Sequence, residues 1–296
     1  MTAIVTVHPY APFLKEVAKH PLVSGLRLNT AMAIKEPFEN LLKRLQDLGK
    51  PLWVDLKARQ LRTVGYWEPP YTEVKVSHPV SVRTPVTAYF GNGEEQVTLV
   101  AVDRDRLFFL DGPERVVGPG ESINIVEPSL NIEGFLTETD LAYINAAKRI
   151  GLHNYMLSFV ESSSDINTLL QYDPKATIVA KIESQKGLTY VRTAYTGEAR
   201  LMAARGDLYI EVSRPHQILD ALETIVKKDQ HAIAASRIFP SLAKSAEPSC
   251  QDIMDVSCLL KMGYKTIMLG DELCMKKEAV LGALHLLDAI ISRSEI

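Results

Sequence analysis

The sequence is poor in the features that mark secreted and membrane proteins. Among its 296 residues are only three cysteines, Cys250, Cys258 and Cys274, whose spacing matches no zinc motif and whose number cannot complete a disulfide framework. We therefore expect free thiols in a reducing cytoplasm. No apolar run approaches the length of a membrane span. The N-terminus lacks the basic start and apolar core of a signal peptide.

An excess of charge is also missing. Lys and Arg number 33 against 36 Asp and Glu, which gives a formal net charge of −3. So small an excess gives the chain no electrostatic means of attracting nucleic acid or an anionic membrane, and we expect neither as a partner. Hydrophobic residues make up 46% of the sequence, enough for a sizeable core, and the length permits one α/β barrel or two smaller domains.

A convincing amphipathic helix is missing from residues 64–127. This stretch holds alternating or β-branched runs, with hairpin signals at Asn92-Gly93 and Asp103–Asp105. We predict a small antiparallel β domain at 64–127, inserted like a lid after the third strand of the surrounding fold. Its expected strands lie within the runs Val80–Tyr89, Val97–Val102, Leu107–Leu110 and Ile123–Val126.

On both sides of this stretch, strand-like runs alternate with helical segments. Thr137-x-x-Asp140 resembles a capping box that opens a helix at 138–150. Eight strands with helices between them favour a closed (β/α)₈ barrel, or TIM barrel, over an open doubly wound sheet. Residues 1–63 and 128–296 would form it. The expected strands are Ala3–Val7, Ser24–Asn29, Leu52–Asp55, Tyr155–Phe159, Ile178–Ala180, Leu201–Ala204, His231–Ala235 and Thr266–Leu269.

Residues 177–212 carry charged side chains just past two neighbouring strands. Lys181 and Glu183 end the first strand, and Asp207 follows the second. Because the carboxyl ends of parallel strands share one rim, we expect these three side chains to lie together. Two carboxylates suit a hard cation such as Mg²⁺ or Mn²⁺, and a lysine suits phosphate or a developing enolate. The pattern alone leaves open a rim network of ion pairs without a ligand.

Both segments resemble signatures of the pyruvate kinase family. AKIESQKG at 180–187 and MAARGDLYIEV at 202–212 are similar to the family's AKIEN-x-EG and MVARGDLGVE, in the same order and at about the same spacing. IMLGDELCMKKEAV at 267–280 is similar to VMLSGETAKGKYPVEAV. Further similar stretches are LRLNTAMA at 26–33, VDLKARQLR at 54–62, SLNIEGFLTETD at 129–140 and LSFVESSSDI at 157–166. These motifs are more specific for the superfamily than for one activity.

The resemblance implies a role for each residue at the catalytic end of the barrel. Lys181 would face the enolate oxygen and the phosphoryl group, and Arg27 would contact the transferring phosphoryl group. Glu183 and Asp207 would be the two protein ligands of Mg²⁺ or Mn²⁺. For Arg27, an ordinary surface salt bridge is the alternative.

The segment Ala204, Arg205, Gly206 and Asp207 is implied to bind substrate, with the N–H groups of Gly206 and Asp207 holding its carboxylate. Ser236 stands where the family has threonine. Its hydroxyl would bond that carboxylate or join a proton relay to the enolate carbon, and a strand-end serine that bonds backbone is the alternative.

On the nucleotide side, the resemblance implies that Arg62 and Asn29 approach the nucleotide phosphates. Asn29, Asp55 and the carbonyl of Leu56 would form a monovalent-cation site for K⁺, with Lys57 and Glu272 in supporting roles. Several departures fall here. Ala31 lacks the family's serine oxygen, which puts K⁺ in doubt, and Met32 replaces a histidine near the nucleotide. The ion and enolate side is therefore nearly complete, whereas the nucleotide side is eroded.

Three functions follow. The first is a cytoplasmic, glycolytic phosphotransferase that moves phosphoryl between phosphoenolpyruvate and ADP or ATP with Mg²⁺, through the enolate of pyruvate. The second is a Mg²⁺-dependent lyase, an oxaloacetate decarboxylase or 2-keto acid aldolase, that uses the same enolate without nucleotide. The third is a non-catalytic sensor of a keto acid or phosphate ester, which the retained charged set argues against. We expect a small-molecule substrate, a homo-oligomer, a shortened lid and no counterpart of the family's C-terminal domain.

Overall fold

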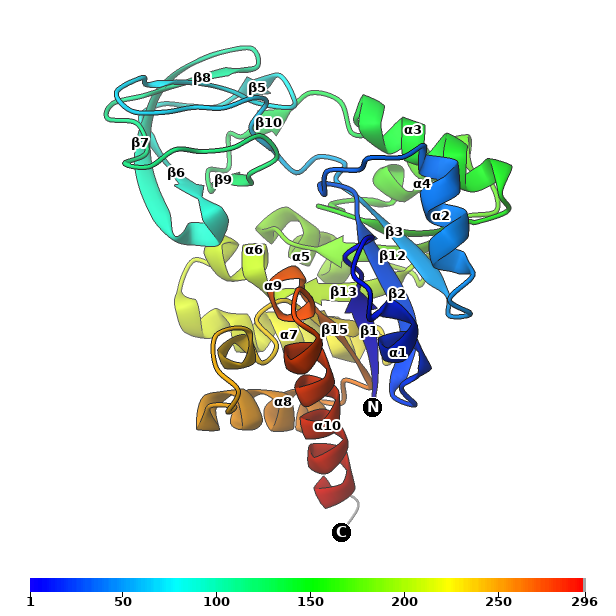
Figure 1. Cartoon of the computed structure of the whole chain (residues 1–296). Helices are drawn as coiled ribbons and strands as arrows, with labels where there is room; N and C mark the ends of the chain where they lie inside the picture. The colour runs from blue at the N-terminus through cyan, green and yellow to red at the C-terminus, as the bar shows by residue number, and fades with distance from the viewer. Residues whose placement is uncertain (295–296) are drawn as a thin grey trace.

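Eight short apolar runs close into a parallel barrel in the computed structural model, which describes residues 1–294. Its strands follow one another around the barrel in the order β1-β15-β14-β13-β12-β11-β3-β2 (Figure 1). The predicted barrel is confirmed, although β14 begins later than expected, at Ile233. The strands are β1 (Thr2–Thr6), β2 (Val23–Asn29), β3 (Leu52–Leu56), β11 (Asn154–Leu157), β12 (Thr177–Ile182), β13 (Arg200–Ala204), β14 (Ile233–Ala235) and β15 (Thr266–Leu269).

Helices surround the strands and bury one apolar face each against them. In α2, for example, Leu41, Leu42 and Leu45 are fully buried, at the spacing that brings side chains to one helical face. The helices are α1 (Leu14–Lys19), α2 (Phe38–Gln46), α3 (Glu138–Arg149), α4 (Ser163–Tyr172), α5 (Gln185–Thr193), α6 (Arg205–Glu211), α7 (Ile218–Lys228), α8 (Cys250–Met262), α9 (Asp271–Cys274) and α10 (Lys277–Ser294), with 3₁₀ turns η2 (Pro215–Gln217) and η3 (Pro240–Ala243).

The interior of the barrel is a packed core. Met156, Met202 and Met268 fill it together with Ile4 and Val179, all nearly inaccessible to solvent. Unbranched methionines suit this task because they adapt to irregular gaps between strands. A filled interior leaves chemistry to the barrel's ends. Within residues 1–294, no helix is long and apolar enough to cross a membrane.

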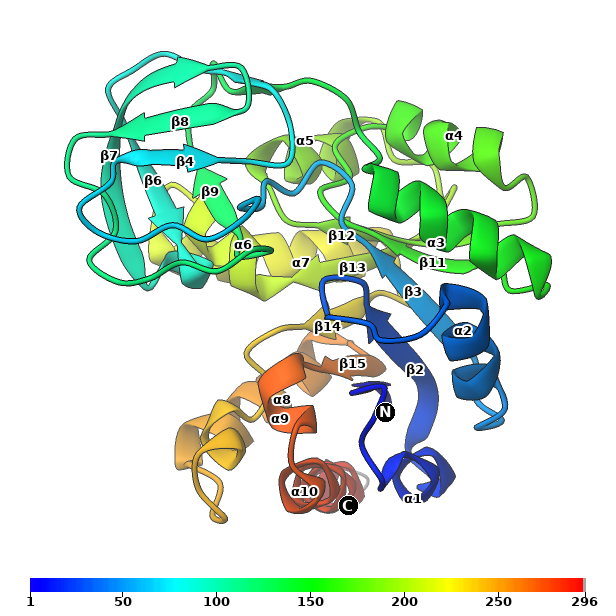
Figure 2. The same ribbon diagram turned by 45° about the horizontal axis from the view of Figure 1, so that its top comes forward.

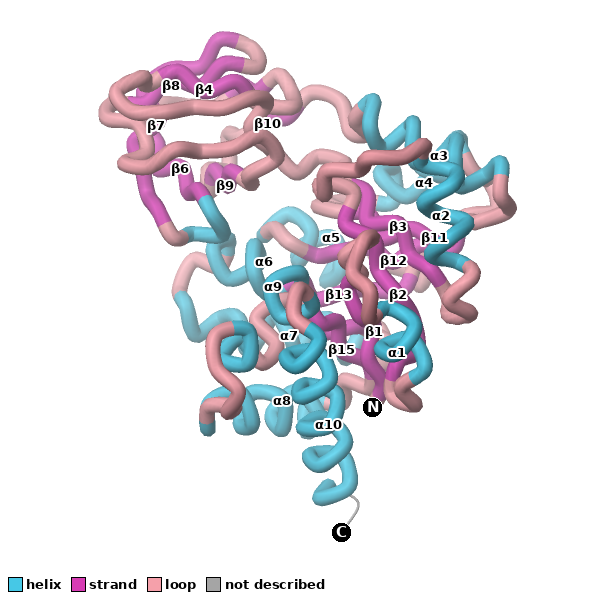
Figure 3. Tube along the Cα trace, in the orientation of Figure 1, coloured by secondary structure: helices cyan, strands magenta, loops and turns pink. Residues whose placement is uncertain are grey.

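The predicted β insert follows β3. Its five-stranded antiparallel sheet has the order β4-β8-β7-β6-β9, and a second pair joins β5 to β10. Figure 3 shows strands and loops here, against helices around the barrel. The run Val80–Tyr89 is divided between β5 and β6, with Pro85 between them. The elements are β4 (Glu73–Lys75), β5 (Val80–Ser81), β6 (Val86–Phe90), η1 (Gly91–Gly93), β7 (Glu95–Asp103), β8 (Arg106–Phe109), β9 (Ile123–Ile125) and β10 (Asn131–Ile132).

The insert has its own small core and leans over the carboxyl ends of the barrel strands (Figures 1 and 2). Phe90 and Phe109 meet edge to face inside it, with ring centroids 5.5 Å apart. Its η1 turn lies against α6, where a Cβ on Gly93 would stand 3.2 Å from the Ile210 side chain. Because β10 pairs with β5, the insert's hydrogen bonding extends past residue 127, the end predicted from the sequence.

The capping box at Thr137 and Asp140 is present, and it supports more than its own helix. Asp140 is fully buried and accepts hydrogen bonds from the N–H of Thr137 at 3.0 Å and the Thr137 hydroxyl at 2.8 Å. It also accepts from the N–H groups of Lys57 and Ala58, at 2.8 and 3.0 Å. Ala58 has a φ of 45°, in the left-handed region. The start of α3 therefore fixes the turn that carries Lys57 out of β3.

We expect Asp140→Ala to lower the free energy of unfolding by about 3 kcal/mol, because buried donors lose their acceptor. Urea unfolding followed by circular dichroism measures this. Glu138→Ala, in the same helical turn but exposed, is the matched control and should change stability by less than about 0.5 kcal/mol. Equal stability of the two variants would show that Asp140 does not support the turn.

Candidate active site

Charged side chains converge where the barrel strands end beneath the insert. We call Arg27, Asp55, Lys57, Lys181, Glu183 and Asp207 the strand-end cluster. Each of the six is at most 7% exposed to solvent. Burying this many charges is costly unless they pair with one another. The pairing within the cluster therefore decides what each group can do.

Asp55 lies at the centre of these pairs. Its Oδ2 accepts from Nε of Arg27 at 3.0 Å, from Nη2 of the same guanidinium, and from Nζ of Lys57 at 2.9 Å. Its Oδ1 accepts from Nζ of Lys181 at 3.2 Å. Burial alone would raise the pKa of Asp55, but the charges of Lys181, Lys57 and Arg27 outweigh burial and hold that pKa well below its usual range. One carboxylate thus positions three cations.

The pKa values of the two lysines of the cluster are shifted in opposite directions. Lys181 donates to the Ser158 hydroxyl at 2.7 Å and lies 3.2 Å from Oε1 of Glu183. Burial acts to lower the pKa of Lys181, yet Asp55 and Glu183 raise it above its usual value, so the ammonium stays charged. Burial lowers the pKa of Lys57 to about 7, with Asp55 opposing the shift. Of the two lysines, Lys181 is therefore the one whose positive charge is fixed.

Glu183 and Asp207 face the same region from neighbouring strands. Oε2 of Glu183 accepts from the N–H of Phe159 at 2.8 Å. Burial raises the pKa of Glu183, and the Asp207 charge raises it further, against the opposing effect of Lys181. A carboxyl with a raised pKa is stabilised in its charged form by a nearby cation. The pair therefore provides hard oxygens whose charged form a further cation would stabilise, beside the ammonium of Lys181.

The residues present fit a divalent cation. Within the described chain, no group of three or more His, Cys, Asp and Glu side chains could hold a metal. An ion here would thus rely on Glu183 and Asp207 with substrate or water oxygens, as Mg²⁺ commonly does. Oδ1 of Asn124 is buried without a hydrogen-bond partner among the described residues, and its Nδ2 donates to Asp207 at 2.9 Å. This orphaned oxygen is a further group that an ion or its water would satisfy.

The expected substrate segment runs from the end of β13 into α6. Ala204 precedes the helix, and Arg205 pairs with both carboxylate oxygens of Asp255, at 2.7 and 2.9 Å. The same guanidinium donates to the carbonyl of Ser236 at 2.9 Å. A Cβ on Gly206 would stand 3.5 Å from the Ser236 hydroxyl. The structure therefore brings the Gly206 backbone and the Ser236 hydroxyl side by side, as a carboxylate site requires.

The residues expected at the nucleotide are engaged within the protein. Arg62 donates through Nε to Oε1 of Gln60 at 3.1 Å and through Nη1 to the carbonyl of Gly120 in the insert. Gln60 in turn places Nε2 3.5 Å from Oδ2 of Asp207. Nδ2 of Asn29 also has a partner within the protein, because it donates to Asp271 at 3.0 Å.

The oxygens expected at the monovalent cation also have partners. Oδ1 of Asn29 accepts from the N–H of Ala31 at 3.1 Å, and the carbonyl of Leu56 accepts from the N–H of Ser158 at 3.2 Å. Asp55 already neutralises three side-chain cations. A potassium ion at this position would have to compete with these cations for Asp55.

Asp271 and Asn124 are among the residues at the site that were not selected from the sequence. Asp271, the first residue of α9, pairs with Arg27 at 2.7 Å, whereas its neighbour Glu272, expected to support the site, is exposed to solvent. The sequence offered one signal for Asp271, a carboxylate just past a strand. Asn124 offered none, because it reaches Asp207 only when the insert leans over the barrel.

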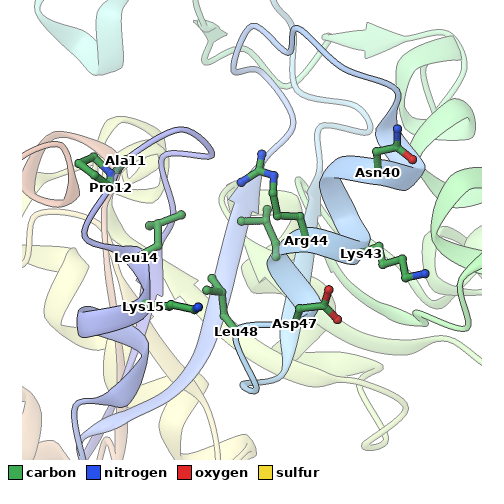
Figure 4. Close-up of a pocket in the computed structure, with 10 residues that line it drawn as sticks. Ala11, Pro12, Leu14, Lys15, Asn40, Lys43, Arg44, Asp47 and Leu48 are labelled. Carbon is green, nitrogen blue, oxygen red and sulfur yellow. The ribbon is translucent and has the colours of Figure 1, made fainter.

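A groove of about 520 Å³ lies elsewhere, between α1 and α2 on the outer wall of the barrel (Figure 4). Its walls include Leu14 and Lys15 from α1 and Lys43 and Arg44 from α2. None of the strand-end cluster lines it. It is therefore no part of the candidate active site.

A charged rim on a (β/α)₈ barrel, covered by a β insert after the third strand, defines the class of this molecule as a lidded barrel protein with an enzyme-like site. Residues 76–277 match the family model described as "Pyruvate kinase, barrel domain", and the chain belongs to the pyruvate kinase family. This confirms the family resemblance of the sequence motifs.

Individual relatives agree. The chain is 25% identical to a pyruvate kinase of Borreliella burgdorferi, over 84% of this chain and 58% of the relative, and 22% identical to one of Thermoplasma acidophilum, over 94% and 55%. It thus spans little more than half the length of these relatives. A crystal structure of Cryptosporidium parvum pyruvate kinase superposes with a TM-score of 0.81 at 18% identity, covering 99% of this chain and 70% of that one, which shows a shared fold.

We expect Asn124→Ala to loosen the insert from the barrel, because Asn124 donates a hydrogen bond to the buried Asp207 carboxylate. Loss of such a charge-assisted bond should raise amide hydrogen exchange in α6 and η1 by about tenfold. Hydrogen-exchange mass spectrometry of Gly91–Gly93 and Arg205–Glu211 tests this. Asn131→Ala, at an exposed position of the same insert, is the control. Identical exchange in both variants would contradict a latching role.

Proposed function

We propose that the protein catalyses Mg²⁺-dependent phosphoryl transfer between phosphoenolpyruvate and ADP, through the enolate of pyruvate. The observation that carries this proposal is the buried, charged Lys181 beside the carboxylates of Glu183 and Asp207. A fixed positive charge where an enolate oxygen develops lowers the barrier, because the site needs no reorganisation as charge appears. Membership of the pyruvate kinase family supports the same reaction.

Each residue of the site has a distinct part in this proposal. Lys181 stabilises the enolate oxygen, and Arg27 binds the transferring phosphoryl group through its remaining donor capacity. The N–H groups of Gly206 and Asp207 hold the substrate carboxylate. Ser236 bonds the same carboxylate or passes a proton toward the enolate carbon.

The metal and the nucleotide complete the proposal. Glu183 and Asp207 would hold Mg²⁺, which would neutralise charge on the phosphoryl and enolate oxygens. Arg62 would leave the carbonyl of Gly120 to meet the nucleotide phosphates as the insert moves. Because Ala31 offers no side-chain oxygen and Asp55 already pairs with three side-chain cations, potassium has no part in this proposal. The reaction is one of glycolysis, and we place it in the cytoplasm with a homo-oligomeric enzyme.

A second candidate is a Mg²⁺-dependent lyase that decarboxylates oxaloacetate or cleaves a 2-keto acid aldol. The engagement of Arg62 by Gln60 and Gly120 favours it, since a lyase needs no nucleotide. It would use Lys181, Glu183 and Asp207 in the same roles, because both reactions pass through an enolate. The two functions therefore differ in what Arg62 does.

We expect Mn²⁺, as a substitute for Mg²⁺, to bind the wild-type protein and to bind Asp207→Ala at least about tenfold more weakly, because half of the carboxylate pair is lost. Titration followed by paramagnetic resonance measures the free ion without any need for activity. Glu272→Gln removes an exposed carboxylate nearby and should leave binding unchanged. Equal binding by Asp207→Ala and wild type would remove Asp207 from the metal site.

Lys181→Met should abolish both phosphoryl transfer and oxaloacetate decarboxylation, with a loss of about 10²–10³-fold or more in rate, because the enolate loses its fixed charge. Arg62→Ala should impair phosphoryl transfer alone, because its proposed partner is a nucleotide phosphate. A coupled assay of phosphoenolpyruvate with ADP and Mg²⁺, run beside oxaloacetate without nucleotide, measures both activities.

The two variants separate the candidate functions. Decarboxylation of oxaloacetate without any response to ADP or to Arg62→Ala would establish the lyase and reject the phosphotransferase. Full activity in Lys181→Met would reject both, because each depends on the same charge.

A further inference from the structure

Arg27 is almost fully engaged by the protein itself. It makes four side-chain hydrogen bonds: Nε and Nη2 donate to Oδ2 of Asp55, and Nη1 donates to the Thr6 hydroxyl at 3.1 Å and to Oδ2 of Asp271 at 2.7 Å. A guanidinium has five N–H donors in a fixed plane. One N–H of Nη2 therefore remains, whereas a fork that grips phosphate uses two.

The two carboxylates that hold Arg27 differ in position. Asp55 is fully buried and also binds Lys57 and Lys181. A movement of Asp55 away from the guanidinium would therefore also break its contacts with these two lysines. Asp271 lies on the outer side, with 38% of its side chain exposed. Its second oxygen, Oδ1, accepts from Nδ2 of Asn29 at 3.0 Å. An incoming anion would therefore compete with Asp271, rather than with Asp55, for Arg27.

The ion pair holds Asp271 in its charged form. Burial alone would raise the pKa of Asp271, but Arg27 and the hydrogen bond from Asn29 lower it to about 2. The carboxylate is therefore ionised at any pH at which the protein works.

We propose that Asp271 is a specificity-determining residue: its carboxylate occupies the outer donor of Arg27 and disfavours ligands that bring a phosphoryl group to this arginine. The inference rests on the proposed function, which assigns Arg27 to the phosphoryl group. Phosphoenolpyruvate would have to displace Asp271 from Arg27 or place its phosphoryl group beside the Asp271 carboxylate. Two negative groups in contact repel each other strongly. Pyruvate and other 2-keto acids, which lack the phosphoryl group, meet no such opposition.

Selectivity follows from where the two ends of the substrate lie. In the proposed function the substrate carboxylate lies at Gly206 and Ser236, after β13 and β14. Asp271 instead opens α9 after β15, and Arg27 lies in β2. A change at Asp271 should therefore alter the phosphoryl end and leave the carboxylate end unaffected. Specificity here comes from an unfavourable contact with the rejected ligand rather than from a new contact with the accepted one.

The test measures binding without turnover. Isothermal titration calorimetry of the full-length protein, with Mg²⁺ and without ADP, gives dissociation constants for phosphoenolpyruvate and for pyruvate. Asp271→Asn, which keeps the side-chain size and removes the charge, should bind phosphoenolpyruvate about tenfold more tightly than wild type and pyruvate within about twofold. Asp271→Ala also frees the Nη1 donor of Arg27 and should show the same changes in both dissociation constants. Asp271→Glu restores the charge and should retain wild-type selectivity.

Glu272→Gln is the matched control, because it neutralises the adjacent, exposed carboxylate and should leave both dissociation constants unchanged. Unchanged phosphoenolpyruvate affinity in both neutral variants would overturn the inference. An equal gain in affinity for phosphoenolpyruvate and for pyruvate would also overturn the inference. That result would mean that removing the charge favours any anionic ligand and does not alter selectivity.

A separate assay with ADP distinguishes this inference from the proposed function. Tighter phosphoenolpyruvate binding by Asp271→Asn, with no phosphoryl transfer by any variant, would support the inference and reject the phosphotransferase. Phosphoryl transfer by wild type, with no gain in affinity in the neutral variants, would support the phosphotransferase and reject the inference.

Discussion

The buried carboxylate of Asp55 is the constraint on which the site depends. It is inaccessible to solvent and binds Arg27, Lys57 and Lys181, which come from three different parts of the barrel rim. Each of these cations would be expensive to bury alone, and the shared anion makes their burial possible. The same contact fixes the direction of each side chain. The positive charge available for an enolate or a phosphoryl group is therefore set by one residue that touches neither in our proposal.

Support for this rim comes from segments that are distant along the chain. Asp140, at the start of α3, holds the turn that carries Lys57, and Asn124, from the insert, reaches Asp207. Such contacts link the charge arrangement to the packing of a helix and to the position of the insert. The electrostatics of the site and the placement of the β domain are thus coupled, since moving the insert would change the hydrogen bonding of a proposed metal ligand.

The site is also asymmetric. Lys181, Glu183 and Asp207 form a group suited to an enolate and a hard cation, whereas Arg62 and Arg27 are bound by neighbouring protein groups. Both arginines would have to exchange internal partners for phosphate oxygens during phosphoryl transfer. Lys181 also contacts Asp55, Ser158 and Glu183, but its positive charge would act on an enolate oxygen through space. The balance between phosphotransferase and lyase therefore depends on how readily two arginines release their present contacts.

Periodicity and local motifs determined the barrel, the position of the insert and the capping box at Thr137, because each reflects contacts within one element or a repeat of one. They also placed Lys181 and Glu183 at a strand end, since the rim follows from parallel strands. Only the tertiary structure decided that Asp271 rather than Glu272 meets Arg27, and that Asn124 meets Asp207. Those contacts join residues far apart in sequence. The direction of α9 decides whether Asp271 or Glu272 reaches Arg27, and the position of the insert decides whether Asn124 reaches Asp207.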